Sequence, residues 1–393
     1  MLWLLDDVVI LLLEKGARVN TGDKDYQRLL EFAIKSHHEF EGDEDAYKNI
    51  IVHLLTYGAS KTEHPMYFTM VLQHGNHFTL QAFNDYGINL KSCPIPFPLH
   101  EVAKNEDKEI LAYLLDGDFL FDLDQVDNSG RTPVFETIKA GNDDSLEALL
   151  IRGASPRAPN RSDIWKELVF HLEKTKDKFS RNRFMMIDLL LTYGAHLPIV
   201  FYQQILEAWK SHSFRDRNSG CVEKAFLKHF LLRDRMGHIH SPDDSNDMWQ
   251  YVTLVYAADE LDDKLEIIGD QYGSELFKMK MLKYARSLAY YDIATNYIHF
   301  GSEAALQCLI DQLEDKDEHC RSFPTFSNVL RSRLDQLKYK KKHIGRASMT
   351  LAKIIKLDYD TFYSIYFKIM GYLGPRDIHV LSNFGLDFYN AQS

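Results

Sequence analysis

The chain has 393 residues, of which 45% are hydrophobic and 12% aromatic, so it can bury a sizeable core and is not expected to be disordered as a whole. Its net charge of -11 argues against a protein that gains its affinity by neutralising nucleic-acid phosphates. We therefore expect an acidic protein that binds other proteins, with no nucleic-acid partner.

The first segment, MLWLLDDVVILLLEKG, is apolar but carries Asp6 and Asp7 in its middle and has no basic residue before the apolar run. It also falls short of the roughly 20 apolar residues that a membrane-spanning helix needs. The segment therefore predicts a buried helix rather than a signal peptide or a membrane anchor. We expect no membrane insertion.

A helix-ending element, LL-x-x-G-A, recurs along the first half of the chain. It occupies residues 12–17, 54–59, 149–154 and 190–195, and Gly87 and Asp118 close further copies between them. The closing positions 16, 58, 87, 118, 153 and 194 are separated by 42, 29, 31, 35 and 41 residues, which brackets a period of about 33. Such a period predicts a stack of small structural repeats.

The least eroded copy is GRTPVFETIKAGNDDSLEALLIRGASPRA, residues 130–158. Thr132 and Pro133 predict a helix start, because threonine can cap the helix and proline loses no needed hydrogen bond in the first turn. Leucines at residues 146–150 form an apolar stripe, and Gly153 predicts a left-handed C-terminal cap. Two such short helices cannot bury their apolar stripes alone, so neighbouring copies must stack.

Residues 1 to about 197 resemble a divergent ankyrin-repeat array, most clearly in SGRTPVFETIKAGNDDSLEALLIRGAS and FPLHEVAKNEDKEILAYLL. The resemblance implies an all-α fold, an ankyrin-type helical solenoid of about five divergent repeats. Residues 2–13 supply only the second helix of a repeat, which indicates an atypical first repeat or a truncated N-terminus. The resemblance further implies that His100 is structural and that its ring hydrogen-bonds the turn of a neighbouring repeat.

The resemblance also implies a binding surface, because ankyrin partners bind the concave face lined by turn tips and inner helices. The positions that match this face are Glu101 and Lys104 on one inner helix, Glu136 and Lys139 on the next, and Asp127, Asn128 and Arg131 at the tip between them. Mixed charge on such a surface suits specific protein contacts. We expect these residues to bind a partner protein, whose identity the sequence does not give, and we expect the chain to act as a monomer.

After residue 197 the repeat pattern fades, but apolar residues keep helical spacing to the C-terminus and no alternating strand pattern occurs. Residues 198–393 are therefore expected to be all-helical. They either continue the solenoid as degenerate repeats or form a separate helical domain. Near the C-terminus, Phe362, Ile365, Tyr366 and Ile369 fall on one helical face, which predicts a buried face.

The segment KYKKKHIGR, residues 338–346, is the one basic run of the chain. Leu330, Leu334 and Leu337 precede it at helical spacing, so we expect the run to continue a helix into solvent. Four cysteines lie far apart and form no C-x-x-C pair, which favours a reducing compartment. We therefore expect a cytoplasmic protein, and the basic run leaves a nuclear location open.

Residue types that carry chemistry gather at one place, where His238, His240, Asp243 and Asp244 lie close together in sequence. A zinc site needs further fixed ligands and a second shell, so a solvated loop is the favoured interpretation. Phosphate-binding glycine motifs, G-x-S-x-G and H-E-x-x-H do not occur. We expect no metal, no cofactor and no catalytic residue in this non-enzymatic interaction scaffold. The alternative is a C-terminal helical catalytic domain that the repeats bring to its substrate.

Overall fold

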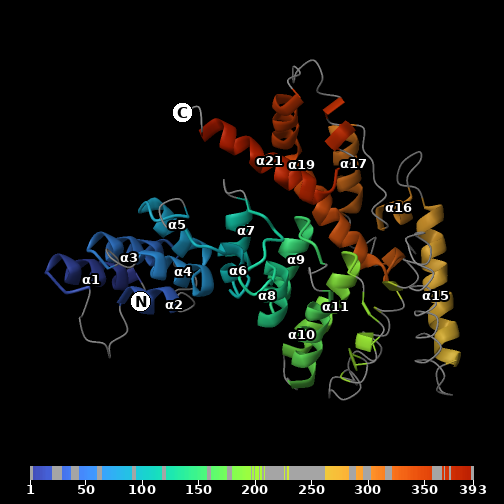
Figure 1. The fold of residues 1–393 in the computed structure, drawn as a ribbon, viewed down its shortest axis with the longest axis horizontal. Helices are drawn as coiled ribbons and strands as arrows, with labels where there is room; N and C mark the ends of the chain where they lie inside the picture. Colours follow the sequence, from blue (N-terminus) through green and yellow to red (C-terminus); the bar gives the residue numbers. More distant parts are fainter. Residues whose placement is uncertain are drawn as a thin grey trace. The chain divides into compact units, whose positions relative to one another are not determined.

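The computed structural model of the chain consists of helices joined by turns and loops, with no β-strand among the elements of its described part (Figure 1). It describes residues 3–19, 29–36, 44–59, 64–90, 94–116, 121–156, 161–174, 179–195, 197–198, 200–202, 204–205, 208, 225, 228–229, 262–282, 289–294, 302–314, 321–355, 365–366, 368–370 and 373–390. The predicted all-α class is confirmed. The chain divides into two compact units, residues 1–148 and 149–393.

The first unit is built from two rows of short helices (Figure 1). One row contains α1 (Trp3–Glu14), α3 (Glu44–Thr56), α5 (His77–Asp85) and α7 (Lys108–Asp116), and the other contains α2 (Leu29–Lys35), α4 (His64–His74), α6 (Pro98–Val102) and α8 (Pro133–Ala140). Within each row, every helix packs against the next member of the row. Each of α2, α4 and α6 also packs against the helix that follows it in the chain, so the unit consists of stacked helix pairs.

The space between the two rows is filled by apolar side chains from both. Ile34 and Val71 come from one row, and Leu55, Leu80 and Phe83 from the other, and each of these side chains is at most 1% exposed. A single pair of helices of this length has no second apolar surface on which to bury such residues. The core of this unit therefore depends on contact between successive pairs.

Five helices end in the same way, namely α1, α3, α5, α9 (Asp143–Ile151) and α11 (Phe179–Thr192). The glycines that follow them are Gly16, Gly58, Gly87, Gly153 and Gly194, and each has a φ angle between 89° and 95°. At the end of α3, for example, Gly58 N–H donates to Leu55 O at 3.0 Å and Ala59 N–H to Leu54 O at 2.9 Å. A side chain would disfavour this left-handed backbone by about 1–2 kcal/mol. The recurring glycines are thus C-caps, while position 118 lies outside the described residues.

The second unit is organised around one long helix, α19 (Ser327–Ile355), which is about 44 Å long at 1.5 Å per residue. The helices α16 (Tyr290–Ala294), α17 (Glu303–Leu313) and α21 (Pro375–Asn390) pack against it, and α16 also packs against α15 (Asp262–Met281). A shared cluster of buried apolar side chains joins these helices. One helix that contacts three others differs from the two rows of the first unit. Whether residues 198–393 continue the repeats or form a separate helical domain remains a prediction from the sequence.

The sequence pattern ends near residue 197, whereas the compact units divide at residue 148. The helices α10 (Arg161–Lys174) and α11 therefore belong to the second unit, where they pack against each other. One contact within this unit joins α11 to α19, where Arg333 donates a hydrogen bond from Nη2 to Thr192 O, at the end of α11, at 3.1 Å.

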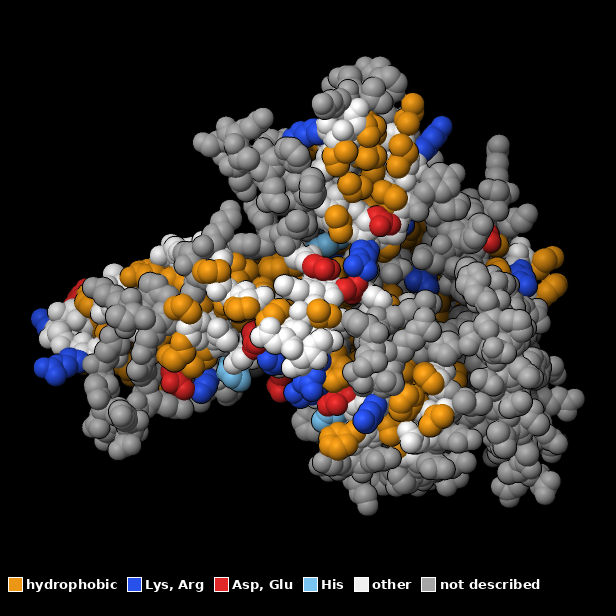
Figure 2. Space-filling view, in the orientation of Figure 1, with side chains coloured by type: hydrophobic (Ala, Val, Ile, Leu, Met, Phe, Trp, Pro, Cys, Tyr) orange, Lys and Arg blue, Asp and Glu red, His pale blue; other side chains and the backbone are white. Residues whose placement is uncertain are grey.

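The predicted buried face near the C-terminus is wrong for two of its residues. Ile365 and Ile369 are 51% and 39% exposed, whereas Tyr366 is 1% and Met370 0% exposed. The buried face therefore contains residues 366 and 370, each one residue later in the helix than the exposed Ile365 and Ile369. Phe362 lies outside the described residues. Exposed hydrophobic side chains gather at the top of the view in Figure 2, where Figure 1 labels α19.

The basic run 338–346 lies inside α19, as the leucine spacing predicts, but it is not a simple solvated face. Tyr339, Lys340 and His343 are all less than 9% exposed, because α21 packs against this part of α19. The Tyr339 hydroxyl lies 2.6 Å from Nδ1 of His379, which belongs to α21. Part of the run therefore serves the contact between the two helices.

Burial lowers the pKa of Lys340 to about 8, although the charge of Asp377 opposes this shift and that of Arg333 adds to it. Between pH 8 and about 10 the unfolded chain then binds a proton at this site that the folded chain has lost, so the free energy of unfolding should rise with pH. We expect Lys340→Met to abolish this rise and to stabilise the protein at pH 7 by roughly 1–3 kcal/mol. Urea unfolding at pH 7, 8.5 and 10 measures both effects.

Lys338→Met is the matched control for this measurement. Lys338 is in the same helix, its side chain is 44% exposed, and it pairs with Glu314 at 2.8 Å. Removing an exposed charge should leave the pH dependence unchanged. An equal change of slope in both variants would contradict the assignment of the effect to buried Lys340.

Candidate functional site

The turn that precedes α8 has a backbone fixed by its own hydrogen bonds. Asp127 N–H donates to Arg131 O at 2.8 Å, and Gly130 N–H donates to Asp127 O at 2.9 Å. The Asp127 carboxylate also accepts hydrogen bonds from the N–H groups of Ser129 and Arg131, at 2.8 and 2.9 Å. Desolvation opposes ionisation of this group, but these backbone donors lower the pKa of Asp127 below its usual value. The turn therefore presents Asn128, which is exposed, from a fixed backbone.

His100 connects this turn to the preceding pair of helices. Its Nε2 atom donates to Arg131 O at 2.8 Å, and its ring packs edge-on against Phe97 at 5.4 Å between centroids. The side chain is 3% exposed. The expected structural bond from His100 to the neighbouring turn is confirmed, and it ties α6 to the chain just before α8.

Arg131 covers the buried residue Glu136. Its Nη1 lies 3.8 Å from Glu136 Oε1, and its guanidinium carbon lies 4.9 Å above the centroid of the Phe135 ring. Glu136 is only 4% exposed, whereas the Arg131 side chain is 40% exposed. Of this pair, Arg131 reaches solvent, whereas Glu136 lies below the surface.

The inner-helix residues differ in how far they reach solvent. Glu101 accepts hydrogen bonds from Gln73 Nε2 and from Lys104 Nζ, the latter at 3.0 Å, and is partly buried. Lys104 and Lys139 are exposed. The first unit therefore contains all seven expected site residues, six of them at or near the surface and Glu136 inside.

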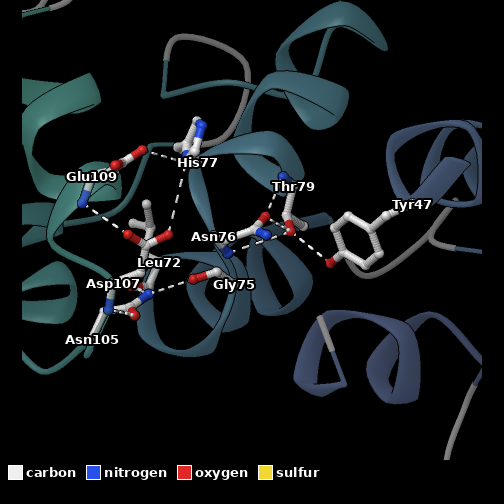
Figure 3. Close-up of polar contacts among 9 residues, drawn as sticks. All are labelled: Tyr47, Leu72, Gly75, Asn76, His77, Thr79, Asn105, Asp107 and Glu109. Carbon is white, nitrogen blue, oxygen red and sulfur yellow. Dashed lines mark hydrogen bonds and ion pairs between the residues drawn. The ribbon is translucent and has the colours of Figure 1, made fainter. Parts of the chain in front are cut away.

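Sequence reasoning missed a set of polar contacts between successive helix pairs, which Figure 3 shows. The amide Nδ2 of Asn105, between α6 and α7, donates to Leu72 O at 3.0 Å and to Gly75 O at 2.8 Å, one pair earlier. Asn142 in turn donates from Nδ2 to Asn105 O. The same residue type in consecutive pairs thus bonds backward along the stack. Of the two donors, Asn142 belongs to a Gly-Asn dipeptide, whereas Asn105 follows Lys104, so the sequence held a signal for Asn142 alone.

These backward contacts of Asn105 and Asn142 are named the asparagine ladder. Toward the N-terminus, the ladder continues through hydroxyl groups (Figure 3). Asn76 Oδ1 accepts from Thr79 N–H at 2.9 Å and caps α5. Thr79 Oγ1 lies 2.7 Å from the hydroxyl of Tyr47, which is 1% exposed and also donates to Ala33 O at 3.3 Å. These buried contacts set the register of one pair on the next, which gives the turn before α8 a fixed support.

We expect Asn105→Ala to destabilise the first unit by about 2–3 kcal/mol, because it leaves the buried carbonyls of Leu72 and Gly75 without a donor. Hydrogen–deuterium exchange of peptides from residues 64–116 should become about thirtyfold faster, with peptides from residues 321–355 unchanged as an internal reference. Asn84→Ala is the control, since the partly buried Asn84 makes one side-chain hydrogen bond, from Nδ2 to the Tyr113 hydroxyl at 3.3 Å. Equal exchange rates in both variants would contradict the role of the ladder.

The second unit holds a buried group of ionisable side chains. Asp188 Oδ1 lies 2.6 Å from Lys228 Nζ and 2.8 Å from His229 Nε2. Desolvation would raise the pKa of Asp188, but the charges of Lys228 and His229 outweigh it and hold this pKa below its usual range. The group ties residues 228–229 to α11.

This group bears on the catalytic alternative, because Thr192 Oγ1 also lies 3.5 Å from His229 Nε2. In a nucleophile–histidine–aspartate triad the acid and the nucleophile bond to opposite ring nitrogens. Here Asp188 and Thr192 face the same nitrogen, and Thr192 is 7% exposed. The observed geometry is that of a structural ion pair rather than of an activated hydroxyl.

No group of three or more His, Cys, Asp or Glu side chains in the described ranges is arranged to hold a metal ion. The expected loop with His238, His240, Asp243 and Asp244 lies outside those ranges. Every helix in the described part of the chain is too short or too polar to span a membrane. Comparisons of the chain with protein-family models, with curated proteins and with solved structures find no significant match in any of the three.

Proposed function

We propose that residues 1 to about 197 are divergent ankyrin repeats and that the protein is a non-enzymatic scaffold that binds a partner protein. The two-row packing of α1 to α8 carries the proposal, because short helices that alternate between rows need repeat neighbours to bury their apolar sides. The bond from His100 to the turn before α8 supports it, since the ankyrin resemblance implies this contact. The proposed scaffold acts as a monomer, without metal or cofactor, in the cytoplasm or the nucleus.

The proposed binding site, which we name the turn surface, consists of Glu101, Lys104, Asp127, Asn128, Arg131 and Lys139. The backbone of its tip, residues 127–131, is held by four hydrogen bonds within this segment. A site whose backbone is already fixed loses little conformational entropy on binding. Such a rigid tip between two inner helices suits recognition of a folded protein surface.

The charges of the turn surface indicate the chemistry of its partner. Two carboxylates, three cations and one amide alternate along it, and acidic and basic side chains are interspersed over residues 1–148 on the face that Figure 2 draws. Mixed signs favour a partner with a complementary pattern and disfavour a uniformly anionic partner. We therefore propose a protein ligand with acidic groups opposite Lys104 and Lys139.

Charge reversal tests the turn surface in the full chain. The variant K104E/K139E and the wild type are used to capture proteins from an extract of the source cells, followed by quantitative mass spectrometry. We expect at least one protein to be recovered at least tenfold less well with K104E/K139E, because two attractive contacts become repulsive. The control K166E/K278E reverses two exposed lysines of the second unit and should retain that protein. Identical recoveries from all three chains would refute the proposal.

A further inference from the structure

One hexapeptide, LLTYGA, occurs twice in the chain, at residues 54–59 and 190–195. The first copy ends α3 and the second ends α11. Gly58 and Gly194 both have a φ angle of 91°, and in each copy the glycine N–H and the following alanine N–H donate to the two leucine carbonyls. The two copies therefore have the same side chains on the same backbone.

The second copy holds an arginine from another helix. Arg333 of α19 donates from Nη2 to Thr192 O at 3.1 Å, and its guanidinium carbon lies 5.9 Å from the centroid of the Tyr193 ring. Thr192 is the last residue of α11, so its carbonyl lies at the negative end of the helix dipole. A helix end and an aromatic face together attract a planar cation.

Among the described residues, the contacts of this arginine are made by neutral groups rather than by a carboxylate. Its other hydrogen bonds go from Nε to Ala294 O at 3.4 Å and from Nη1 to Gln336 Oε1 at 2.9 Å. Arg333 is 8% exposed, and burial lowers the pKa of its guanidinium, while the neighbouring Tyr193 opposes that shift. In this protein, two carbonyl groups at helix ends, the side-chain amide of Gln336 and a tyrosine ring together hold a buried guanidinium.

The neighbouring helix end uses the same kind of contact. Arg152, the residue before the capping Gly153 of α9, has its guanidinium carbon 5.4 Å from the centroid of the Tyr339 ring of α19. The helix α19 thus contacts the ends of both α9 and α11, each time through a cation–π pair that involves the residue before the capping glycine. Helix ends of this type are a docking face for a helix.

The first copy of the hexapeptide is exposed. Tyr57 is 44% exposed and Thr56 is also exposed, and no cation of the described residues stacks on the Tyr57 ring. The Thr56 hydroxyl donates back to Val52 O at 2.8 Å, which leaves the ring and the helix end facing solvent. Within the described part of the chain, the same site is therefore filled at residues 192–193 and open at residues 56–57.

From this pairing we infer that Thr56 and Tyr57 form a guanidinium-binding site for an arginine on a helix of a partner protein. The Thr56 carbonyl accepts from the guanidinium, and the Tyr57 ring stacks on it, as Thr192 and Tyr193 do with Arg333. The occupant is an α-helix, because the filled copy is contacted by a helix that crosses the capped helix ends. This site is separate from the turn surface and does not depend on it.

A fluorescein-labelled peptide of residues 327–346, which contains Arg333, serves as the probe. We expect it to bind the full chain in a fluorescence anisotropy titration, and we expect Tyr57→Ala to weaken binding at least tenfold. Tyr57→Phe keeps the ring and should bind within twofold of the wild type. A peptide with Arg333→Lys should also bind at least tenfold more weakly, since lysine lacks the planar fork that stacks and donates together.

Tyr86→Ala is the matched control in the chain. Tyr86 also precedes a left-handed glycine and is 38% exposed, but the residue before it, Asp85, already pairs with Lys48 at 2.7 Å. We expect this variant to bind the peptide as the wild type does. Absence of binding, or a loss that Tyr57→Ala and Tyr86→Ala share equally, overturns the inference.

Light scattering separates two possible sources of the helix. The chain should stay monomeric at the concentrations of the titration, with or without Tyr57→Ala. A dimer that disappears in Tyr57→Ala would assign the site to α19 of a second copy and overturn the assignment to a different protein. Normal peptide binding by K104E/K139E is expected in addition, so failure of the turn surface and failure of this site can be told apart.

Discussion

Gly153→Ala is expected to destabilise the second unit by about 2–5 kcal/mol. Two effects add, because Gly153 has a φ angle of 95°, and a β-carbon at this position would overlap the backbone nitrogen and α-carbon of Arg376. The left-handed backbone alone disfavours alanine by about 1–2 kcal/mol, and forced displacement in a packed contact adds about 1–3 kcal/mol. Urea unfolding, followed by exchange of peptides from α19 and α21, measures the loss.

Gly194→Ala isolates the second effect. Gly194 has nearly the same backbone, with a φ angle of 91°, it caps α11 in the same unit, and nothing lies within 4 Å of a β-carbon built on it. We expect this control to lose about 1–2 kcal/mol. The difference between the two variants reports how tightly the start of α21 packs on the end of α9. Equal losses would show that α21 moves aside easily.

The helix ends were the part of the fold that the sequence predicted best. A left-handed C-cap favours glycine whatever the neighbouring helices are. Gly58 and Gly194 therefore predict such caps from the sequence alone. The Thr132 cap is equally local, with its Oγ1 accepting from Phe135 N–H at 3.4 Å. Such features depend on a few consecutive residues. This is why the closing positions 16, 58, 87, 153 and 194 could be predicted from the sequence as helix ends.

Burial of charged residues could not be predicted in the same way. Glu101 and Glu136 occupy matching positions of two copies, yet Glu136 is buried because Arg131 folds over it and Phe135. The exposure of a side chain depends here on the shape of the preceding turn. The same limit applies to Lys340, whose burial results from α21, a helix that begins 35 residues later in the chain.

The asparagine ladder shows an intermediate case. Asn105 lies between α6 and α7, and its Oδ1 accepts from Asp107 N–H at 2.9 Å, a local contact of the kind asparagine often makes. Its bonds to Leu72 O and Gly75 O depend instead on the distance between successive helix pairs. These longer-range bonds are therefore seen only in the packed structure, which is why the sequence did not predict them.

Arg333→Ala should destabilise the second unit by about 2–4 kcal/mol, since it removes one buried group that joins three acceptors. Two of these are the carbonyls of Thr192 and Ala294, the last residues of α11 and α16. Each hydrogen bond to a charged group contributes about 1.5–3 kcal/mol, but the desolvation of the guanidinium offsets part of the sum. Arg331→Ala, an exposed arginine of the same helix, should change the free energy of unfolding by no more than about 0.5 kcal/mol.

Arg333→Lys then separates charge from geometry. Lysine keeps the positive charge near the helix ends but has one nitrogen, so it cannot reach both carbonyls and stack on Tyr193 at once. We expect it to recover less than half of the loss caused by Arg333→Ala in urea unfolding. Full recovery would show that the helix ends attract any cation, and the partner helix at Tyr57 would then need only a lysine. Partial recovery would show that the site at Thr192 and Tyr193 prefers a planar guanidinium to an ammonium group. The proposed site at Thr56 and Tyr57 should then have the same preference.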